Sequence, residues 1–236
     1  MARKFNRILL KLSGEVLAGE KGHGFDFSVI EEIARTIKKV SEEGTEVGVV
    51  IGGGNFWRGR SSGSMDRNKA DSIGMLGTVM NSIALADTLI SEGVDAKVYS
   101  AIAMDPIAEI FQVDKVMEDL SAGKVTIFGG GTGNPFFSTD SAAALRAAQI
   151  QADVIFKATN VDGVYDSDPN KNPNAVKFDE LTQSDLLAKG LTVMDASAAS
   201  LCRDSGIDIL VFNLNDPENI IRAVKGETIG TLVTSK

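Results

Sequence analysis

The segment that decides the fold is EVGVVIGGGNFWRG, residues 46–59, in which a short apolar run ends in three consecutive glycines. Similar β-rich runs recur along the chain, and amphipathic helical stretches separate them. This alternation is typical of right-handed βαβ crossovers that feed a parallel sheet. We therefore predict a three-layer α/β/α fold with a mostly parallel central sheet, whose strands cover residues 7–12, 46–51, 96–101, 124–128, 154–157 and 208–212.

Two helices carry clear end signals. After the first strand, Ser28 and Glu31 have the spacing of a capping box, an apolar residue recurs on one face, and Gly44 supplies the stop. Near the end of the chain an N-cap, a proline at the first helical position and a terminating glycine follow one another: Asp216, Pro217 and Gly226. The first pattern predicts a helix between the first two strands, and the second predicts a short helix after the last one.

Composition narrows the class of protein. With 236 residues, 43% of them hydrophobic and 24% charged, the chain can bury the core of one α/β domain or of two closely fused lobes. No apolar run approaches the ~18 residues of a membrane span, so we expect a cytoplasmic protein without a membrane partner. The net charge of −8 argues against a nucleic-acid partner, because such proteins usually present a basic face.

Single residues exclude several catalytic chemistries. His23 is the only histidine, which removes a histidine-based triad and a histidine-rich zinc site, and its loop position favours an exposed side chain. Cys202 is the only cysteine and lies among small and apolar residues, which predicts a buried structural thiol. Neither a G-x-G-x-x-G fingerprint nor a P-loop motif occurs.

Two glycine-bearing segments that follow predicted strands can bind phosphate. The first is Lys11–Gly14, and the second is Gly52–Asn55 followed by Arg58. Glycine lets the backbone approach phosphate oxygens closely, while the lysine and the arginine supply positive charge. Each segment alone is also compatible with a merely structural turn and a solvated lysine. Their shared position at strand ends is the stronger signal.

The most specific segment is GGGTGNPFFSTD, residues 129–140, which leads into an alanine-rich helical pattern. Ser138 or Thr139 can cap that helix, whose first amides would then face an anion. Thr132 and Asn134 offer polar groups to a base edge, and the two phenylalanines that follow offer apolar area. The alternative is a tight loop with both phenylalanines in the core.

A fourth segment, KATNVDGVYDSD at residues 157–168, ends a predicted strand. Tyr165 can lie against an adenine, with Thr159, Asn160 and Asp168 reaching its edges or the ribose. The alternative is a tight turn with a packed tyrosine. The turn-rich stretch 166–174 that follows can also mark a border between two lobes.

Together these segments resemble bacterial UMP kinases, which belong to the amino acid kinase fold family. The resemblance follows the chain in order and is carried by KLSGE at 11–15, IGGGN at 51–55, GMLGTVMN at 74–81, GTGNPFFSTD at 131–140, KATNVDGVYDSDP at 157–169 and VMDASAAS at 193–200. It spans essentially the whole chain. The joined GTGNPFF and VDGVYDSDP motifs are specific, whereas the glycine triplet is shared with carboxylate kinases of the same fold. One departure is Ser138, where many relatives have threonine.

The resemblance implies transfer of the ATP γ-phosphoryl group to UMP in pyrimidine nucleotide synthesis, with Mg²⁺ bound mainly through the ATP phosphates and no dedicated metal site. It implies three catalytic residues: Lys11, Arg58 and Asp195. The implied ATP site comprises Lys11, Leu12, Ser13, Gly14, Gly54, Arg58, Thr159, Asn160, Tyr165 and Asp168. The implied UMP site comprises Gly53, Asp71, Thr132, Gly133, Asn134, Pro135, Phe136, Phe137, Ser138 and Thr139.

The resemblance also implies a homohexamer that UTP inhibits and GTP activates, with acceptor binding in residues 1–152 and ATP binding in 153–236. The loop linked to GTP comprises Gly19, Glu20, Lys21, Gly22, His23 and Gly24. An apolar face of the 73–89 stretch either packs subunits together or fills the core; it comprises Ile73, Leu76, Met80, Ile83 and Leu85. Asp195 can alternatively serve only as the N-cap of the helical pattern after it.

Two other functions remain open from the residues. One is a kinase of the same fold that acts on a carboxylate, a carbamate or an isoprenoid phosphate. The other is a nucleotide or oxyanion storage and sensing protein without catalysis. The polar groups of the 131–140 loop favour a base over a simple carboxylate, and Lys11 together with Asp195 favours catalysis over storage.

Overall fold

The protein is described by a computed structural model that covers residues 5–58, 63–167, 169, 171–191 and 193–235. Nine strands form one sheet in the order β4-β3-β5-β2-β1-β6-β10-β11-β9, and β11 runs antiparallel to β10 while all other neighbours are parallel. These strands are β1 (Arg7–Leu12), β2 (Glu46–Ile51), β3 (Ala96–Ser100), β4 (Glu109–Ile110), β5 (Val125–Gly129), β6 (Val154–Thr159), β9 (Glu180–Thr182), β10 (Asp208–Asn213) and β11 (Thr231–Thr234). A separate antiparallel pair consists of β7 (Val164–Tyr165) and β8 (Lys177–Phe178).

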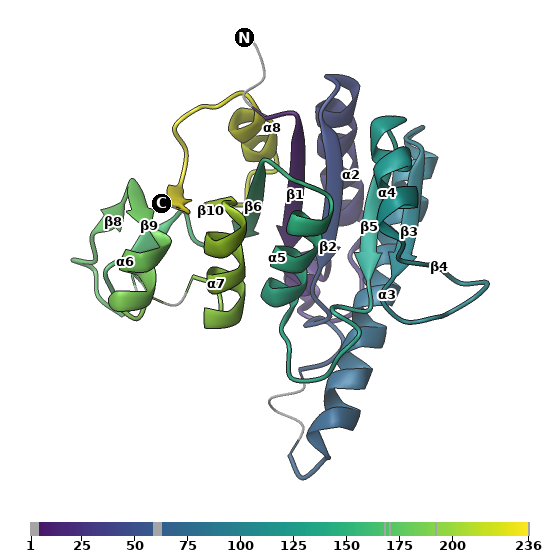
Figure 1. The fold of residues 1–236 in the computed structure, drawn as a ribbon, viewed down its shortest axis with the longest axis horizontal. Helices are drawn as coiled ribbons and strands as arrows, with labels where there is room; N and C mark the ends of the chain where they lie inside the picture. Colours follow the sequence, from purple (N-terminus) through teal and green to yellow (C-terminus); the bar gives the residue numbers. More distant parts are fainter. Residues whose placement is uncertain (1–4, 59–62, 168, 170, 192, 236) are drawn as a thin grey trace.

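Helices cover both faces of the sheet, which confirms the predicted three layers (Figure 1). The helices that share a core with one face are α2 (Phe27–Glu42), the C-terminal half of α3 (Arg67–Ser91) and α8 (Glu218–Val224). The helices on the opposite core are α4 (Val113–Ser121), α5 (Thr139–Gln149), α6 (Gln183–Ala188) and α7 (Ala196–Ser205). A short α1 (Gly14–Leu17) and the 3₁₀ turn η1 (Gly19–Lys21) join β1 to α2.

The six predicted strands all exist. The bounds of β1 and β2 are as predicted, and those of β3, β5, β6 and β10 differ by one or two residues. In β1, β2, β5, β6 and β10 the central residues are buried because helices cover both sides, which explains why these strands are mostly apolar. In β3 the central Val98 is only half-buried.

The predicted capping box of α2 is wrong by two residues. Asp26 is the N-cap, and its carboxylate accepts hydrogen bonds from the Ser28 backbone N–H at 3.2 Å and from the Ser28 hydroxyl at 2.6 Å. Ser28 is therefore already inside the first turn. The stop at Gly44 is confirmed by its φ of 85°, a value that favours glycine. At α8 the cap shifts by one residue to Pro217, although Asp216 accepts from the Glu218 N–H at 3.0 Å.

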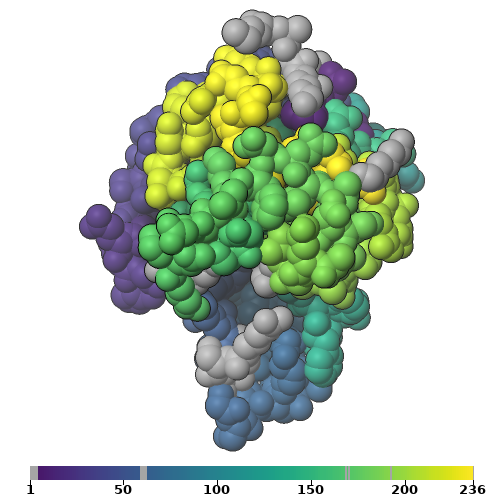
Figure 2. Space-filling view, turned by 90° about the vertical axis from the view of Figure 1, so that its left-hand side faces the viewer, coloured from purple at the N-terminus to yellow at the C-terminus, as the bar shows by residue number. Residues whose placement is uncertain are grey.

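Helix α3 is longer than the sequence pattern suggests, and it extends past the ends of the strands (Figure 1). In Figure 2 its blue N-terminal half projects below the green and yellow C-terminal part, and the surface is indented where the two meet. By length and apolar composition α3 alone among the described helices is suited to crossing a membrane, yet half of that stretch is buried and packs on β5 and β3. Core helices of globular proteins share this composition.

Candidate active site

A cavity of about 900 Å³ lies at the carboxyl ends of β1, β2 and β5, where an open α/β sheet places its ligands. Residues from three predicted segments line it together: Lys11, Ser13, Gly14, Gly53, Gly54, Arg58, Thr132, Asn134, Phe136, Phe137, Ser138 and Thr139. Asp71 of α3 and Asp195, the residue before α7, also line this cavity. Leu12 is completely buried and does not line the cavity, and Gly133 and Pro135 lie in the 131–140 loop without lining it either.

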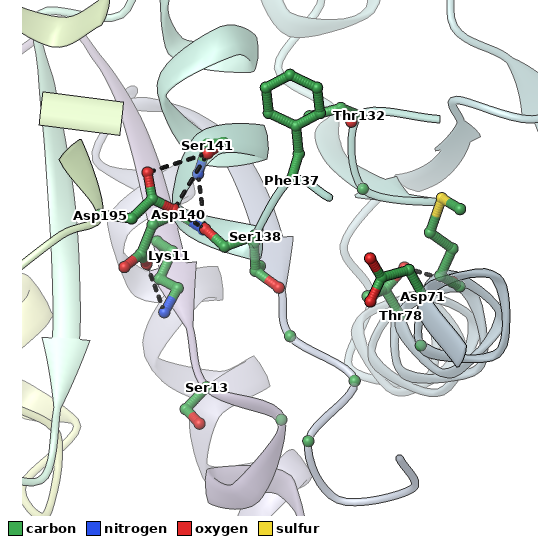
Figure 3. Close-up of a pocket in the computed structure, with 18 of the residues that line it drawn as sticks. Lys11, Ser13, Asp71, Thr78, Thr132, Phe137, Ser138, Asp140, Ser141 and Asp195 are labelled. Carbon is green, nitrogen blue, oxygen red and sulfur yellow. Dashed lines mark hydrogen bonds and ion pairs between the residues drawn. The ribbon is translucent and has the colours of Figure 1, made fainter. Parts of the chain in front are cut away.

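A carboxylate lies between two lysines at the floor of this cavity. Lys11 and Lys157 are register partners on the adjacent parallel strands β1 and β6. Their ammonium groups lie 2.9 and 2.8 Å from the two carboxylate oxygens of Asp140, in the first turn of α5. Lys157 also donates to the Val193 carbonyl. Figure 3 shows Lys11, Asp140 and Asp195 on one side of the cavity, opposite Asp71 on α3.

Burial and the neighbouring charges have opposite effects on the pKa of Asp140. Burial disfavours the ionised form of Asp140, but the positive charges of Lys11 and Lys157 and their hydrogen bonds outweigh it, so the pKa of Asp140 is lowered. The pKa of Lys157 is lowered too, by burial and by the charge of Lys11, against the opposing attraction of Asp140 and Asp195. The site therefore keeps a fixed carboxylate and two close cations in a partly dry environment.

The glycine loop after β2 approaches α1 and α3 so closely that side chains are excluded. A Cβ on Gly14 would lie 2.2 Å from the Gly52 carbonyl oxygen, and one on Gly53 would lie 2.6 Å from the Gly74 carbonyl oxygen. The Gly52 N–H donates to the Leu12 carbonyl at 3.0 Å. Within the described chain, no acceptor is found for the N–H groups of Gly53 and Gly54. These amides are available to phosphate oxygens.

Arg58, the second predicted cation, lies at the rim of the cavity. Its guanidinium pairs with the Glu15 carboxylate, and both side chains are largely exposed. An exposed pair of this kind contributes little to stability and can be exchanged for a stronger anion. The structure thus places Arg58 beside the two glycine-bearing segments without burying it.

Asp195 joins the first turns of two helices. Its carboxylate caps α7 by accepting the Ala198 N–H at 2.9 Å, and it accepts the hydroxyls of Ser138 and Ser141, the latter at 3.1 Å. The Ser138 hydroxyl in turn caps α5, accepting the N–H groups of Asp140 and Ser141 at 3.0 and 3.2 Å. Ser138 is therefore the cap of α5, as predicted, and the N–H groups of Asp140 and Ser141 are not open to an anion because they donate to its hydroxyl.

The loop before α5 is fastened to α3 across the cavity. The Asp71 carboxylate accepts the Phe136 N–H at 2.8 Å and the Arg67 Nε–H at 2.7 Å, and the Arg67 guanidinium lies 5.5 Å from the centre of the Phe136 ring. Phe136 has a φ of 70°, which is uncommon for a bulky residue. Phe136 and Phe137 are 65% and 55% exposed, so the alternative that they belong to the core is wrong.

A second cavity of about 650 Å³ adjoins the first and shares Lys157 and Val193 with it. Thr159 and Tyr165 line it, and the Tyr165 hydroxyl donates to Asp162 at 2.6 Å. This hydrogen bond raises the pKa of Tyr165. Asp168, expected here, lies outside the described residues.

A third cavity of about 940 Å³ lies on the α2 side of β1. Its lining includes Lys11, Gly19, Glu20 and Asn160. The remaining residues of the 19–24 loop line none of these three cavities. His23 is exposed, as expected, and its Nδ1 lies 3.0 Å from the Lys21 carbonyl oxygen.

Sequence reasoning missed several cavity residues. Asp140 and Lys157 stood inside the quoted motifs, but their pairing depends on the β1–β6 register, which no local pattern reveals. Ser141 could be recognised only through its contact with Asp195. Arg67 and Trp57 carried no signal at all.

Cys202 lies in the core, away from the solvent-accessible cavity. Cys202 is completely buried, which confirms the structural interpretation, and burial together with the charges of Asp140 and Asp195 raises the pKa of its thiol to about 12. Among the residues that the structure describes, no three His, Cys, Asp or Glu side chains are grouped so that they can hold a metal ion.

Comparison with known proteins agrees with this geometry. The model of the amino acid kinase family matches residues 6–213. A UMP kinase from Bacillus anthracis is 37% identical with a TM-score of 0.95, covering 99% of this chain and 98% of its own. A UMP kinase from Ureaplasma parvum is 38% identical with a TM-score of 0.92, covering 99% and 100%. A uridylate kinase from Archaeoglobus fulgidus is 34% identical with a TM-score of 0.72, covering 96% and 99%. The chain therefore belongs to the amino acid kinase family.

Proposed function

We propose that this protein transfers the γ-phosphoryl group of ATP to UMP, giving UDP and ADP for pyrimidine nucleotide synthesis. The observation that carries the proposal is the junction of two adjoining cavities at Lys157, with Lys11 and Asp140 beside it. A donor phosphate entering from one cavity and an acceptor phosphate entering from the other meet between two cations. The similarity to UMP kinases over the whole chain supports UMP as the acceptor.

The acceptor half is the cavity between β5 and α3. Asp71 lines this cavity and is proposed to accept hydrogen bonds from the ribose hydroxyls. Thr132 and Asn134 line it too and are proposed to contact the edge of the uracil. Gly53 and Thr139 border the phosphate end. Phe136, Phe137 and Ser138 of the same loop also line this cavity, and Gly133 and Pro135 are proposed to shape the loop without lining it.

The donor half is the adjoining cavity. Tyr165 and Thr159 line the space for adenosine, and Asn160 and Asp168 are proposed to assist them. Segment Lys11–Gly14, together with Gly54 and Arg58, is proposed to hold the triphosphate. In this arrangement residues 1–152 supply the acceptor lobe and residues 153–236 the ATP lobe.

Phosphoryl transfer needs alignment and positive charge more than it needs proton transfer. A phosphate oxygen of UMP attacks the γ-phosphorus of ATP; the new P–O bond forms as the bond to the β–γ bridging oxygen breaks, and ADP leaves. The UMP phosphate is already largely deprotonated at neutral pH, so no general base is required. Lys11, Lys157 and the free amides of Gly53 and Gly54 stabilise the charge on the equatorial oxygens.

Asp195 and Asp140 act through other groups. Asp140 holds both lysines at bonding distance from one carboxylate, so their spacing is fixed before substrates bind. Asp195 holds Ser138 and Ser141, and thereby the start of α5. We assign both as positioning residues, and we assign Lys11 and Arg58 to contact with the phosphates.

Mg²⁺ fits this site as a companion of ATP. Because no cluster of three acidic or histidine ligands occurs in the described parts of the chain, phosphate oxygens and water would supply most of its ligands, as magnesium commonly prefers. When bound it neutralises charge on the transferred group. Asp140 and Asp195 are the carboxylates that line the cavity near that position.

Assembly and regulation are part of the same proposal. We propose a cytoplasmic homohexamer that UTP inhibits and GTP activates, with Gly19–Gly24 as the loop that responds to GTP. Exposed apolar residues on α3 support subunit packing: Ile73, Leu76, Met80 and Ile83. Leu85 is the one residue of the predicted apolar face that is fully buried, so only Leu85 belongs to the core.

The decisive test is a comparison of acceptors. Purified protein with ATP and Mg²⁺ is incubated with UMP, CMP, AMP or small carboxylates while ADP release is followed. Preference for UMP is the expected result. Faster turnover with a carboxylate would favour the related carboxylate kinases, and binding without ADP release would favour a storage or sensing protein.

Lys11→Ala tests the charge assignment. Removing one electrostatic stabiliser at the transfer site lowers turnover by roughly 10²-fold or more. Steady-state rates at saturating ATP and UMP measure this. Near-wild-type turnover would refute the role of Lys11.

A further inference from the structure

Two buried asparagines form a reciprocal amide pair directly under the glycine loop. The Asn55 side-chain NH₂ donates to the Asn81 side-chain oxygen at 2.9 Å, and the Asn81 NH₂ donates to the Asn55 side-chain oxygen at 2.8 Å. The second hydrogen of each NH₂ goes to a backbone carbonyl. Asn81 donates to Gly52 at 2.6 Å, and Asn55 donates to Gly24 at 2.8 Å.

Burying two amides costs free energy, and here every N–H of both side chains donates a hydrogen bond. Asn55 is 3% exposed and Asn81 on α3 is completely buried. Buried amides are tolerated only when they are hydrogen-bonded, and an apolar pair of similar shape can stabilise a core equally well. A closed polar network fixes one relative arrangement of the groups it joins, which an apolar contact does less strictly. The pair joins β2's loop, α3 and the segment before α2.

The groups held by the pair are those that shape the phosphate end of the cavity. The Gly52 N–H is fixed to the Leu12 carbonyl, and the Gly52 carbonyl is fixed to Asn81. Asn55 is fixed on its own backbone as well, because its carbonyl accepts the Gly24 N–H at 3.1 Å. The two residues between them are Gly53 and Gly54, whose N–H groups have no acceptor in the described chain.

We propose that Asn55 and Asn81 are positioning residues for phosphate, because they hold both ends of the Gly52–Asn55 loop so that the amides of Gly53 and Gly54 face the transferring group. Neither asparagine lines the first cavity, the one at the ends of β1, β2 and β5. The inference rests on the proposed function and adds to it the residues that set the geometry of the loop.

The test uses Asn81→Asp, which keeps the shape of the side chain but removes the donor to Gly52. Binding of UMP and of uridine, which lacks the phosphate, is measured by calorimetry, together with turnover. Loss of one fixed hydrogen bond near a charged ligand corresponds to about tenfold weaker binding or more. We expect that loss for UMP, unchanged uridine binding, and lower turnover at saturating UMP and ATP.

Gln183→Glu is the matched control. Gln183 on α6 is also completely buried and also donates from its amide to a backbone carbonyl, that of Ile207, at 2.9 Å. This substitution removes a comparable hydrogen bond outside the three cavities. Its thermal midpoint falls, while its ratio of UMP to uridine affinity remains that of the wild type.

A second variant covers the case in which Asn81→Asp does not fold. Asn55→Leu combined with Asn81→Leu replaces the amide pair by an apolar pair of similar size, and we expect the same selective loss of UMP affinity. If either folded variant bound UMP as the wild type does, or lost uridine and UMP affinity equally, the positioning role would be wrong. Absence of UMP phosphorylation by the wild type in the same assay would instead refute the proposed function.

Discussion

Asp140 shows how one residue can set the chemistry of a site through the side chains that it holds in place. It holds two ammonium groups that lie side by side on adjacent strands. Asp140→Asn leaves these buried cations without a counter-charge, so we expect turnover to fall by about 10²-fold and the protein to lose stability. Steady-state kinetics and thermal unfolding measure the two effects. Asp95→Asn, at an exposed carboxylate, is the control and should change neither.

The stabilising effect of Asp140 has a defined pH dependence. Its folded-state pKa is lowered, so its contribution is fully present above the unfolded value of about 3.9 and is lost as the pH falls through the folded-state pKa. The difference in thermal midpoint between wild type and Asp140→Asn should therefore be largest near neutral pH and shrink in acid. A difference that grew on acidification would contradict this assignment.

Asp71→Asn tests the acceptor half at the same scale. Asp71 both faces the proposed ribose position and accepts the Phe136 N–H, so its loss affects the acceptor loop by either route. We expect the KM for UMP to rise more than the KM for ATP. Initial rates with each substrate varied in turn measure this, and equal effects on both would mean that Asp71 is wrongly placed.

At the scale of elements, the start of α5 is the most sensitive point. Ser138→Ala removes the hydroxyl that caps α5 and donates to Asp195. Loss of such a cap costs about 1 kcal/mol, and the altered start of α5 also moves Asp140. We expect a lower unfolding free energy and lower turnover, measured by denaturant unfolding and rates. Ser138→Thr retains the hydroxyl and should keep both; a defect as large as that of alanine would exclude the cap as the cause.

The elements were predictable to different degrees. Strands such as β1 and β2 were found to the residue because burial on both faces makes them continuous apolar runs between turn residues. The two-residue strands β4, β7 and β8 were missed, since they are too short to show a period. The start of α3 was missed because its first turns are polar and project from the sheet. Helix ends shifted by one or two residues where two capping residues stand close together, as at Asp26 and Ser28.

At the scale of the whole molecule, the apolar residues left exposed on α3 predict association. Leu76→Glu places a charge among Ile73, Met80 and Ile83, and we expect it to dissociate the proposed hexamer. Light scattering at fixed protein concentration measures the mass. Ile107→Glu, at another exposed apolar residue that lies outside α3, is the control. A wild-type protein that is monomeric would overturn the prediction directly.

The site was predictable from sequence only as a set of segments. The glycines, Lys11 and the polar residues of the 131–140 loop indicated a site for phosphate and a base, because backbone amides, a cation and base-edge partners suit such ligands. Which of these residues contact one another depends on the order of the strands in the sheet, and local sequence patterns do not reveal that order. Lys157 becomes a neighbour of Lys11 only because β6 pairs with β1 across more than a hundred residues of chain.

That pairing also limits how the gene can change. Side chains alternate between the two faces of a strand, so inserting or deleting a single codon within β1 or β6 would swing one ammonium group to the α2 side of the sheet. Length variation among descendants of this sequence should therefore accumulate in surface connections, while these two strands keep their spacing even where their individual apolar residues are exchanged.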